Sequence, residues 1–229
     1  MAKYKEIVSM VLDMLKVTSD DSTYTEDHII FLAGRYRSFL LKQRYSDQKK
    51  PIPESNYQTL CLSLEKADPI ADFPYGTPFR RTVEQIPDMM PFGNTRVYAS
   101  CSYYEGELTL VTKDRMKYVG YNKWMQNMIY ACLDPNGHIY ITSMNPQYMY
   151  LEEIKLNGIF ENAEEVSDLE CKNKDAEGNL INCDILDRDF PLEDALVLPM
   201  IELIVKDLSP SIATPEDKTN DANDKMTEN

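Results

Sequence analysis

The sequence predicts an α+β protein with an N-terminal helical hairpin or bundle, a small central antiparallel β domain, and a C-terminal helix followed by a polar tail. Near both ends of the chain, apolar side chains recur every three or four residues, which is the spacing of helices that bury one stripe. Between these ends, β-branched and aromatic residues are interrupted by turn signals, a pattern typical of short strands.

In sequence ranges, the prediction is a helical domain at 1–66, a proline-rich arm at 67–94, a β domain at 95–186, a C-terminal helix at 187–209 and an acidic tail at 210–229.

Two helices are expected first, packed antiparallel. The apolar stripe of the first consists of Tyr4, Ile7, Val8, Val11, Leu12 and Leu15. Thr23 and Glu26 have the spacing of a capping box before the second helix. Its apolar stripe consists of Ile29, Leu32, Ala33, Tyr36, Phe39 and Leu40. This helix should end near Tyr45, because a polar stretch and then Pro51 and Pro53 follow.

A helical turn and a strand are expected next, before a segment that contains many prolines. Leu60, Leu62 and Leu64 alternate with polar or small residues, which is strand periodicity. Prolines then recur at Pro69, Pro74, Pro78, Pro87 and Pro91, so no long regular element is expected there. Such an arm can become ordered against a neighbouring molecule, and Tyr75 and Phe79 are its candidate contacts.

The β domain is predicted from several short apolar runs. Strands are expected within 96–99, 108–111, 116–119, 148–156 and 180–186, with a short acidic helix at 163–170. The strongest local signal is a hairpin of strands at 128–133 and 138–142 around the turn from Asp134 to Gly137. Trp124 and the many tyrosines of this region are interpreted as packing residues, with a base-stacking or interface surface as the alternative.

The final helix should begin at Asp189-Phe190-Pro191, and Pro199 should break or restart it. Its apolar repeat includes Ile201, Ile204, Val205 and Leu208. Beyond Pro210 the apolar residues are sparse, as in a tail that becomes ordered only on a partner.

Composition excludes several classes of protein. A net charge of −14 disfavours a surface that wraps nucleic acid. No signal-peptide core and no membrane-length apolar run is present, so no membrane partner is expected. The five cysteines are widely spaced and odd in number, which predicts free thiols and no structural disulfide.

Charge is distributed unevenly along the chain. Residues 35–50 carry six basic side chains against one acid, whereas residues 161–194 carry twelve acids against three bases. Arg35, Arg37 and Arg44 are therefore candidate partner-binding residues. Oppositely charged regions suit contacts between copies, and two solvated faces are the alternative.

No enzyme, cofactor or metal site is predicted. His28 and His138 are the only histidines, and neither lies in a recognisable catalytic motif. The sequence contains no paired cysteine or histidine ligands and no glycine-rich phosphate loop. A small hydrolase using Cys101 or a carboxylate pair, with His138 as base, is the alternative from another functional class.

Two early runs carry a family resemblance: Arg37 to Tyr45 (RSFLLKQRY) and Ile52 to Gln58 (IPESNYQ). Asn157 to Glu161 and Asp189 to Leu192, with the Met200 to Leu203 run, have the same texture. Together they resemble structural proteins of crAss-like bacteriophages of the gut, which have short tails. The resemblance spans most of the chain but depends on overall pattern rather than a diagnostic motif.

The resemblance implies a virion protein, made in the cytoplasm of the host bacterium, that forms a dodecameric ring under the portal. Such a head-to-tail connector packs copies side by side around the DNA channel, and the genome passes without specific binding. The portal and an adjacent tail or ring protein are the implied partners. The C-terminal helix and tail would dock on the portal through Ile201, Ile204, Leu208 and Ile212. Another virion or cargo protein, or a monomeric protein-binding module, is the alternative.

Overall fold

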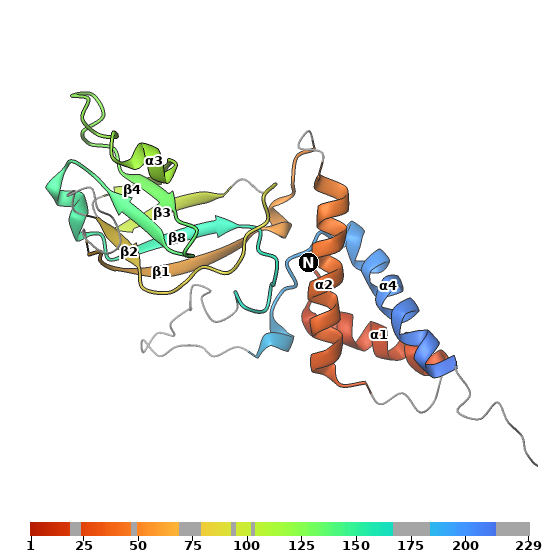
Figure 1. Ribbon diagram of the computed structural model, residues 1–229. Coiled ribbons are helices and arrows are strands. Elements are labelled where there is room, and N and C mark those ends of the chain that lie inside the picture. Colours follow the sequence, from red (N-terminus) through yellow and green to blue (C-terminus); the bar gives the residue numbers. More distant parts are fainter. Residues whose placement is uncertain are drawn as a thin grey trace, which may run out of the picture.

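Three long helices form one body of the molecule and a strongly curved sheet forms the other (Figure 1). The computed structural model describes residues 1–18, 24–46, 50–68, 79–92, 95–101, 104–166 and 184–213. The long helices are α1 (Tyr4–Thr18), α2 (Glu26–Tyr45) and α4 (Asp194–Ala213). The α+β fold class and the order of helices, sheet and helix are as predicted.

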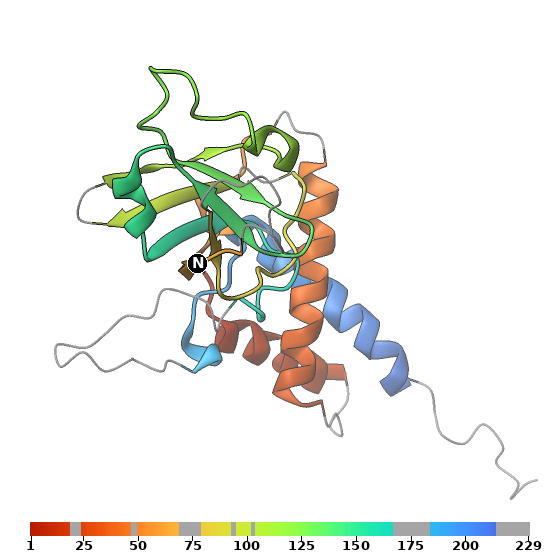
Figure 2. The same ribbon diagram turned by 60° about the vertical axis from the view of Figure 1, so that its left-hand side comes forward.

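The helical body buries one continuous apolar core. The α1 stripe predicted from the sequence is buried at Tyr4, Ile7, Val8, Val11 and Leu15. Helix α4 packs against both α1 and α2. Helix α1 lies crosswise to α2 rather than antiparallel beside it, as Figures 1 and 2 show. The expected two-helix hairpin is therefore a three-helix arrangement that needs the C-terminal helix to close its core.

The β body is an eight-stranded sheet with the order β4-β3-β8-β1-β2-β7-β6-β5. Its strands are β1 (Gln58–Lys66), β2 (Arg80–Thr82), β3 (Arg96–Cys101), β4 (Tyr104–Glu107), β5 (Thr109–Leu110), β6 (Tyr130–Leu133), β7 (Ile139–Thr142) and β8 (Glu153–Gly158). All pairings are antiparallel except that of β5 with β6, which is parallel. The sheet is therefore antiparallel, as predicted, at every pairing except that of β5 with β6.

The sheet closes on itself. Strands β4 and β5 stand at opposite ends of the strand order, yet only Leu108 separates them in the chain. The amide of Leu108 donates to Val97 on β3, and the amide of Thr109 donates to Ile129 just before β6. The segment from β4 to β5 thus pairs with both β3 and β6 and joins the two ends of the strand order. The core that the sheet encloses contains Leu60, Leu62, Val97, Leu108, Ala131, Ile141, Ile154 and Leu156.

Strand β1, which was predicted within the helical range 1–66, lies between β8 and β2 near the middle of the sheet. It follows the short 3₁₀ helix η1 (Glu54–Asn56), as the turn-then-strand prediction required. The chain therefore enters the β body before the proline-rich arm. Of that arm, residues 69–78 lie outside the described residues, and β2 forms just after them.

Several local predictions differ from the structure. The cap of α2 is Thr25, whose hydroxyl accepts from the amide of His28, whereas Thr23 lies outside the described residues. Residues 116–119 were expected to be a strand, but the short helix α3 (Lys113–Met116) and a turn occupy this region. Met116 and Val119, three residues apart, pack against Tyr130 and Tyr140 on the outer side of β6 and β7 instead of forming a strand.

The C-terminal predictions also need correction. Helix α4 begins at Asp194, not at Asp189, and it continues through Pro199. A proline removes one helical hydrogen bond, but burial of Met200, Ile201 and Ile204 on the following turn outweighs that loss. The 3₁₀ helix η3 (Ile185–Asp187) occupies the end of the strand expected at 180–186, whose first residues lie outside the described part. The 3₁₀ helix η2 (Pro146–Tyr150) precedes β8.

Candidate protein-binding surfaces

Arg37 is fully buried, although it was predicted as a partner-binding residue. Its Nε donates to the carbonyl of Pro191 at 2.7 Å, Nη1 to Phe160 at 2.8 Å and Nη2 to Asn56 at 3.2 Å. These carbonyls belong to the segments that precede α4, follow β8 and precede β1. Burial lowers the pKa of the guanidinium to about 10. Arg37 thus joins the helical body to the sheet, and its buried side chain is not accessible to a partner.

Two more basic residues of α2 form ion pairs within the chain. Lys42 pairs with Glu161, and Arg44 Nε lies 3.0 Å from an oxygen of Glu193. Tyr45 also donates to Glu193, at 2.9 Å. Both acids come from the acidic range 161–194, so part of the predicted charge complementarity between copies is satisfied inside one copy. Of the three residues expected to form a basic face, Arg37 is buried and Arg44 pairs with Glu193, so Arg35 remains as the candidate for contact with a partner.

The outward side of α2 combines that remaining arginine with exposed aromatic rings. Phe31 is 47% exposed and Phe39 is 55% exposed, and with Arg35 they lie four residues apart along one side of the helix. The Arg35 guanidinium lies 4.9 Å from the centre of the Phe31 ring. We call Phe31, Arg35 and Phe39 the α2 face. Aromatic and arginine side chains are enriched at the energetic centres of protein interfaces.

The sequence pattern predicted that Phe39 belongs to the buried stripe of α2, but the structure shows Phe39 exposed. The buried positions are Ile29, Ile30, Ala33, Gly34, Arg37, Leu40, Leu41 and Tyr45. Arg37 occupies the middle of this stripe, and Phe39 is turned outward as a result. If arginine is assumed to lie on the surface, the apolar pattern therefore predicts a buried stripe that is shifted by one residue from the observed one.

Most of the other predicted partner contacts are inside the fold. Phe79 is buried between α3 and the outer side of β6 and β7. Ile201, Ile204 and Leu208 are buried in the helical core, so α4 uses its apolar stripe within the chain. Because these four side chains are buried, the prediction that they contact a partner directly does not agree with the structure. Tyr75 lies outside the described residues, and Ile212 lies in α4 with no described side chain.

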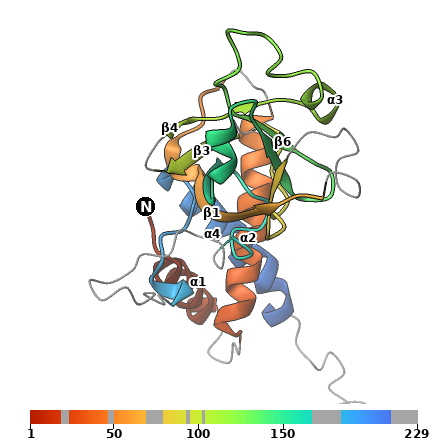
Figure 3. The ribbon, with the colours of Figure 1, turned by 90° about the vertical axis from the view of Figure 1, so that its left-hand side faces the viewer.

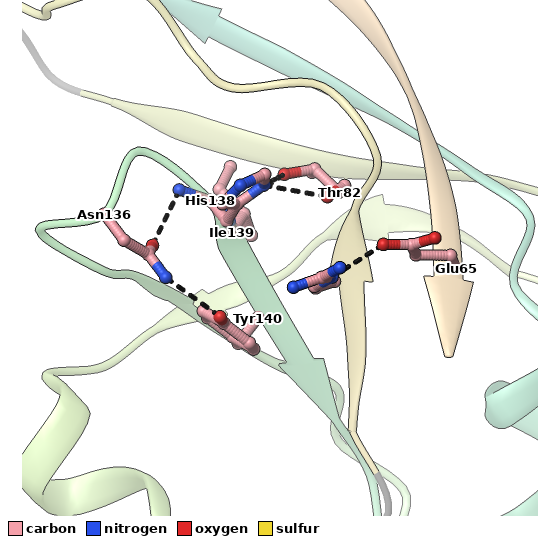
Figure 4. A network of polar contacts seen from close by, with 7 residues as sticks. Glu65, Thr82, Asn136, His138, Ile139 and Tyr140 are labelled. Atoms are coloured by element: carbon pink, nitrogen blue, oxygen red, sulfur yellow. Dashed lines mark hydrogen bonds and ion pairs between the residues drawn. The ribbon is translucent and has the colours of Figure 1, made fainter. Parts of the chain in front are cut away.

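His138, the base of the alternative hydrolase hypothesis, makes contacts that hold the sheet together (Figure 4). Its Nδ1 lies 2.9 Å from the carbonyl oxygen of Thr82 on β2 and therefore donates its proton there. The Thr82 hydroxyl accepts from the amide of Ile139, and Asn136 bridges the His138 amide and the Tyr140 hydroxyl. The two bonds to Thr82 join β2 to the start of β7, and the two Asn136 bonds lie within the β6–β7 hairpin. The Cys101 side chain is not among those described.

The structure contradicts the prediction that all cysteines are free thiols. Cys61 on β1 is disulfide-bonded, and its partner is not among the described side chains. Sequence spacing cannot show which cysteines a sheet brings together, so this prediction was wrong for Cys61. Cys132 is a free, buried thiol. Among the described residues, no group of three or more His, Cys, Asp or Glu side chains has an arrangement that would hold a metal.

The segment between α3 and β6 projects from the sheet, as Figure 3 shows at the top of the view. Residues 121–128 are exposed without interruption. Trp124 is 86% exposed, and Tyr118, Tyr121, Met125 and Met128 are also exposed. We call residues 118–128 the aromatic loop. The tyrosines and the tryptophan of the β region were interpreted as packing residues. This is correct for Tyr130 and Tyr140, which are buried in strands, but wrong for the exposed rings of the aromatic loop.

An apolar hollow of about 270 Å³ lies where the start of α4 meets α1. Its lining residues are Ala2, Met10, Asp194, Val197, Leu198 and Ile201. Leu198 and Met10 are exposed at its mouth. We call it the α1/α4 hollow. No helix in the described part of the chain is long and apolar enough to cross a bilayer.

Comparison with known proteins identifies the family. The family model for phage tail ring protein 2 matches residues 6–226. A curated relative, ring protein 2 of the Bacteroides phage crAss001, is 48% identical over 224 residues, which cover 97% of each protein. The resemblance to crAss-like phage ring proteins that the sequence indicated is thereby confirmed. The chain belongs to the phage tail ring protein 2 family of crAss-like phages.

Proposed function

We propose that this chain is a structural subunit of a ring that lies beneath the portal, joins capsid to tail and surrounds the DNA channel. The ring is dodecameric and acts without catalysis, and its neighbours are the portal and an adjacent tail or ring protein. Membership of a ring protein family over nearly the whole chain supports a structural role in the virion.

The observation that carries the proposal is the α2 face. Phe31, Arg35 and Phe39 are exposed on a long helix that is held rigidly by Arg37 and by the pairs with Glu161 and Glu193. A preorganised helix with aromatic and arginine side chains loses little conformational entropy when a partner covers it. The negative net charge of −14 also suits a channel through which DNA slides without adhering.

The first test is the mass of the full chain, alone and mixed with the portal of the same phage, by mass photometry. We expect ring-sized complexes, in solution or on the portal. A chain that stays monomeric with and without portal and neighbouring ring proteins would contradict the ring and favour a monomeric binding module or a cargo protein.

The second test is Arg35→Glu, which places a negative charge between two exposed phenylalanines. We expect assembly to weaken by about tenfold or more, as for the loss of an interface arginine, and high salt to weaken the unmutated chain in the same direction. Lys155→Glu on the exposed side of β8 makes the same charge change and should leave assembly intact. Equal behaviour of the two variants would exclude the α2 face as an interface.

A further inference from the structure

The aromatic loop has the properties of a preformed binding element. Gly120 at its base has φ +82°, and a Cβ there would lie 2.7 Å from Met144. At the other end the Ser143 hydroxyl donates to the Met128 carbonyl at 3.0 Å, and Asn145 donates to Asn127 at 3.2 Å. These contacts fix the base of the loop, while its apolar side chains remain in solvent. The loop is held in shape before any partner arrives.

The aromatic loop and the three residues before it carry positive charge. Residues 115–128 include Arg115, Lys117 and Lys123 and contain no acid, in a chain of net charge −14. Lys117 lies over the ring of Tyr118, 5.0 Å from its centre. The loop therefore presents aromatic rings and positive charge together, and its natural counterpart is an apolar depression with an acidic rim.

The α1/α4 hollow has that character. Its floor is apolar, and Asp194 forms part of its wall with a largely exposed carboxylate, which lies 3.7 Å from the ammonium group of Met1. Glu202 is exposed four residues beyond Leu198 on α4, and Asp13, whose carboxylate lies 3.8 Å from Lys16 Nζ, is exposed three residues beyond Met10 on α1. Both lie on the side of their helix that borders the hollow. An indole or phenol ring fits a depression of about 270 Å³, and burying one removes roughly 150–250 Å² from water.

The aromatic loop projects from the sheet, whereas the elements that line the hollow, α1 and the start of α4, belong to the helical body (Figure 1). The loop and the hollow therefore lie apart within one copy. A contact between two different patches of identical chains is heterologous, and it produces a ring when the rotation between neighbours closes.

We propose that the aromatic loop of one copy inserts Trp124 into the α1/α4 hollow of the next copy, with Lys123 facing the acidic rim around Asp194. This inference rests on the proposed ring and names a second contact of the subunit interface, separate from the α2 face. Trp124 is the anchor because its ring is the most exposed large apolar side chain among the described residues. The occupant is a copy of the chain itself, because an aromatic ring beside a lysine matches an apolar depression bordered by three carboxylates, of which two pair with cations of their own copy.

The test is a double-mutant cycle on assembly of the full chain, measured by mass photometry under conditions in which the unmutated chain forms its ring. We expect Trp124→Ala and Leu198→Asp each to weaken self-association by about tenfold or more, and the double variant to lose little beyond either single change. Tyr150→Ala, on another highly exposed aromatic ring, is the matched control and should assemble normally. Tyr121→Ala provides a second probe of the loop if Trp124→Ala alters the thermal melt.

The outcomes separate the inference from the ring itself. If the unmutated chain forms rings and Trp124→Ala forms them equally well, the ring stands and the loop contact is wrong. If Trp124→Ala weakens assembly but Leu198→Asp does not, or if the two losses add in full, the loop binds elsewhere and the inference is overturned. It is also overturned if the loop variants assemble normally but lose affinity for duplex DNA, because the basic aromatic loop would then contact nucleic acid.

Discussion

Replacing Arg37 by methionine tests whether the buried guanidinium holds the helical body to the sheet. Methionine keeps an unbranched side chain of similar length but removes every donor. Three carbonyl oxygens, of Pro191, Phe160 and Asn56, then lose their hydrogen bonds in a buried site. Hydrogen bonds from a charged donor contribute about 2 kcal/mol each, so the gross loss is about 6 kcal/mol.

Removing the buried guanidinium charge also removes the free-energy cost of burying it. Burial lowers the Arg37 pKa from 12.5 to about 10, which corresponds to roughly 3 kcal/mol against the charged form. The net destabilisation expected for Arg37→Met is therefore about 3 kcal/mol. With a denaturant slope of about 3 kcal/mol per molar urea for a chain of this size, the unfolding midpoint should fall by about 1 M.

The assay is urea unfolding of the full chain followed by circular dichroism, with Arg35→Met as the control two residues away on the same helix. Arg35 is exposed, so this control should unfold within about 0.5 kcal/mol of the unmutated chain. Arg37→Lys keeps the charge but not the planar fork and should lie between the two. If Arg37→Met and Arg35→Met unfold at the same midpoint, Arg37 does not join the two bodies and the reasoning fails.

Two further predictions concern titratable groups. Burial raises the pKa of Glu164, with Asp27 and Glu165 adding repulsion, so the folded state binds this proton more tightly than the unfolded state does. Stability should then fall as pH rises above 4.5 through the raised pKa, and Glu164→Gln should flatten that part of the urea-midpoint profile; an unchanged profile would refute it. Burial also raises the pKa of the Cys132 thiol to about 11, so iodoacetamide at pH 8 should modify Cys132 only after unfolding, whereas rapid labelling of the folded chain would show that the thiol is accessible.

Much of the fold was predictable because its signals are local. The α1 stripe, the turn before β1 and the hairpin of β6 and β7 each follow from residue spacing within a few positions. Closure of the sheet was not predictable in this way. It depends on one segment meeting both β3 and β6, and no periodicity within residues 104–110 indicates which distant strands it will contact.

The candidate surfaces were harder to predict than the fold, for a physical reason. Arginine is usually a surface residue, so Arg37 was grouped with Arg35 and Arg44, and its three carbonyl acceptors come from segments far apart in the chain. Tyr121 and Trp124 lie in a region rich in strand-forming residues and look like packing residues until the turns around them are known. A surface tyrosine and a core tyrosine have the same sequence signature.

Closure of the sheet has a consequence for how copies of this protein find each other. An open sheet presents unpaired backbone amides and carbonyls, which join indiscriminately with other strands when many copies are made at once. Here the segment that contains β4 and β5 engages both ends of the strand order within the described residues. In the proposed ring, association then depends on side chains rather than on backbone edges. Assembly governed by side chains is reversible and responsive to salt, which lets a misplaced copy leave and rebind before the particle is complete.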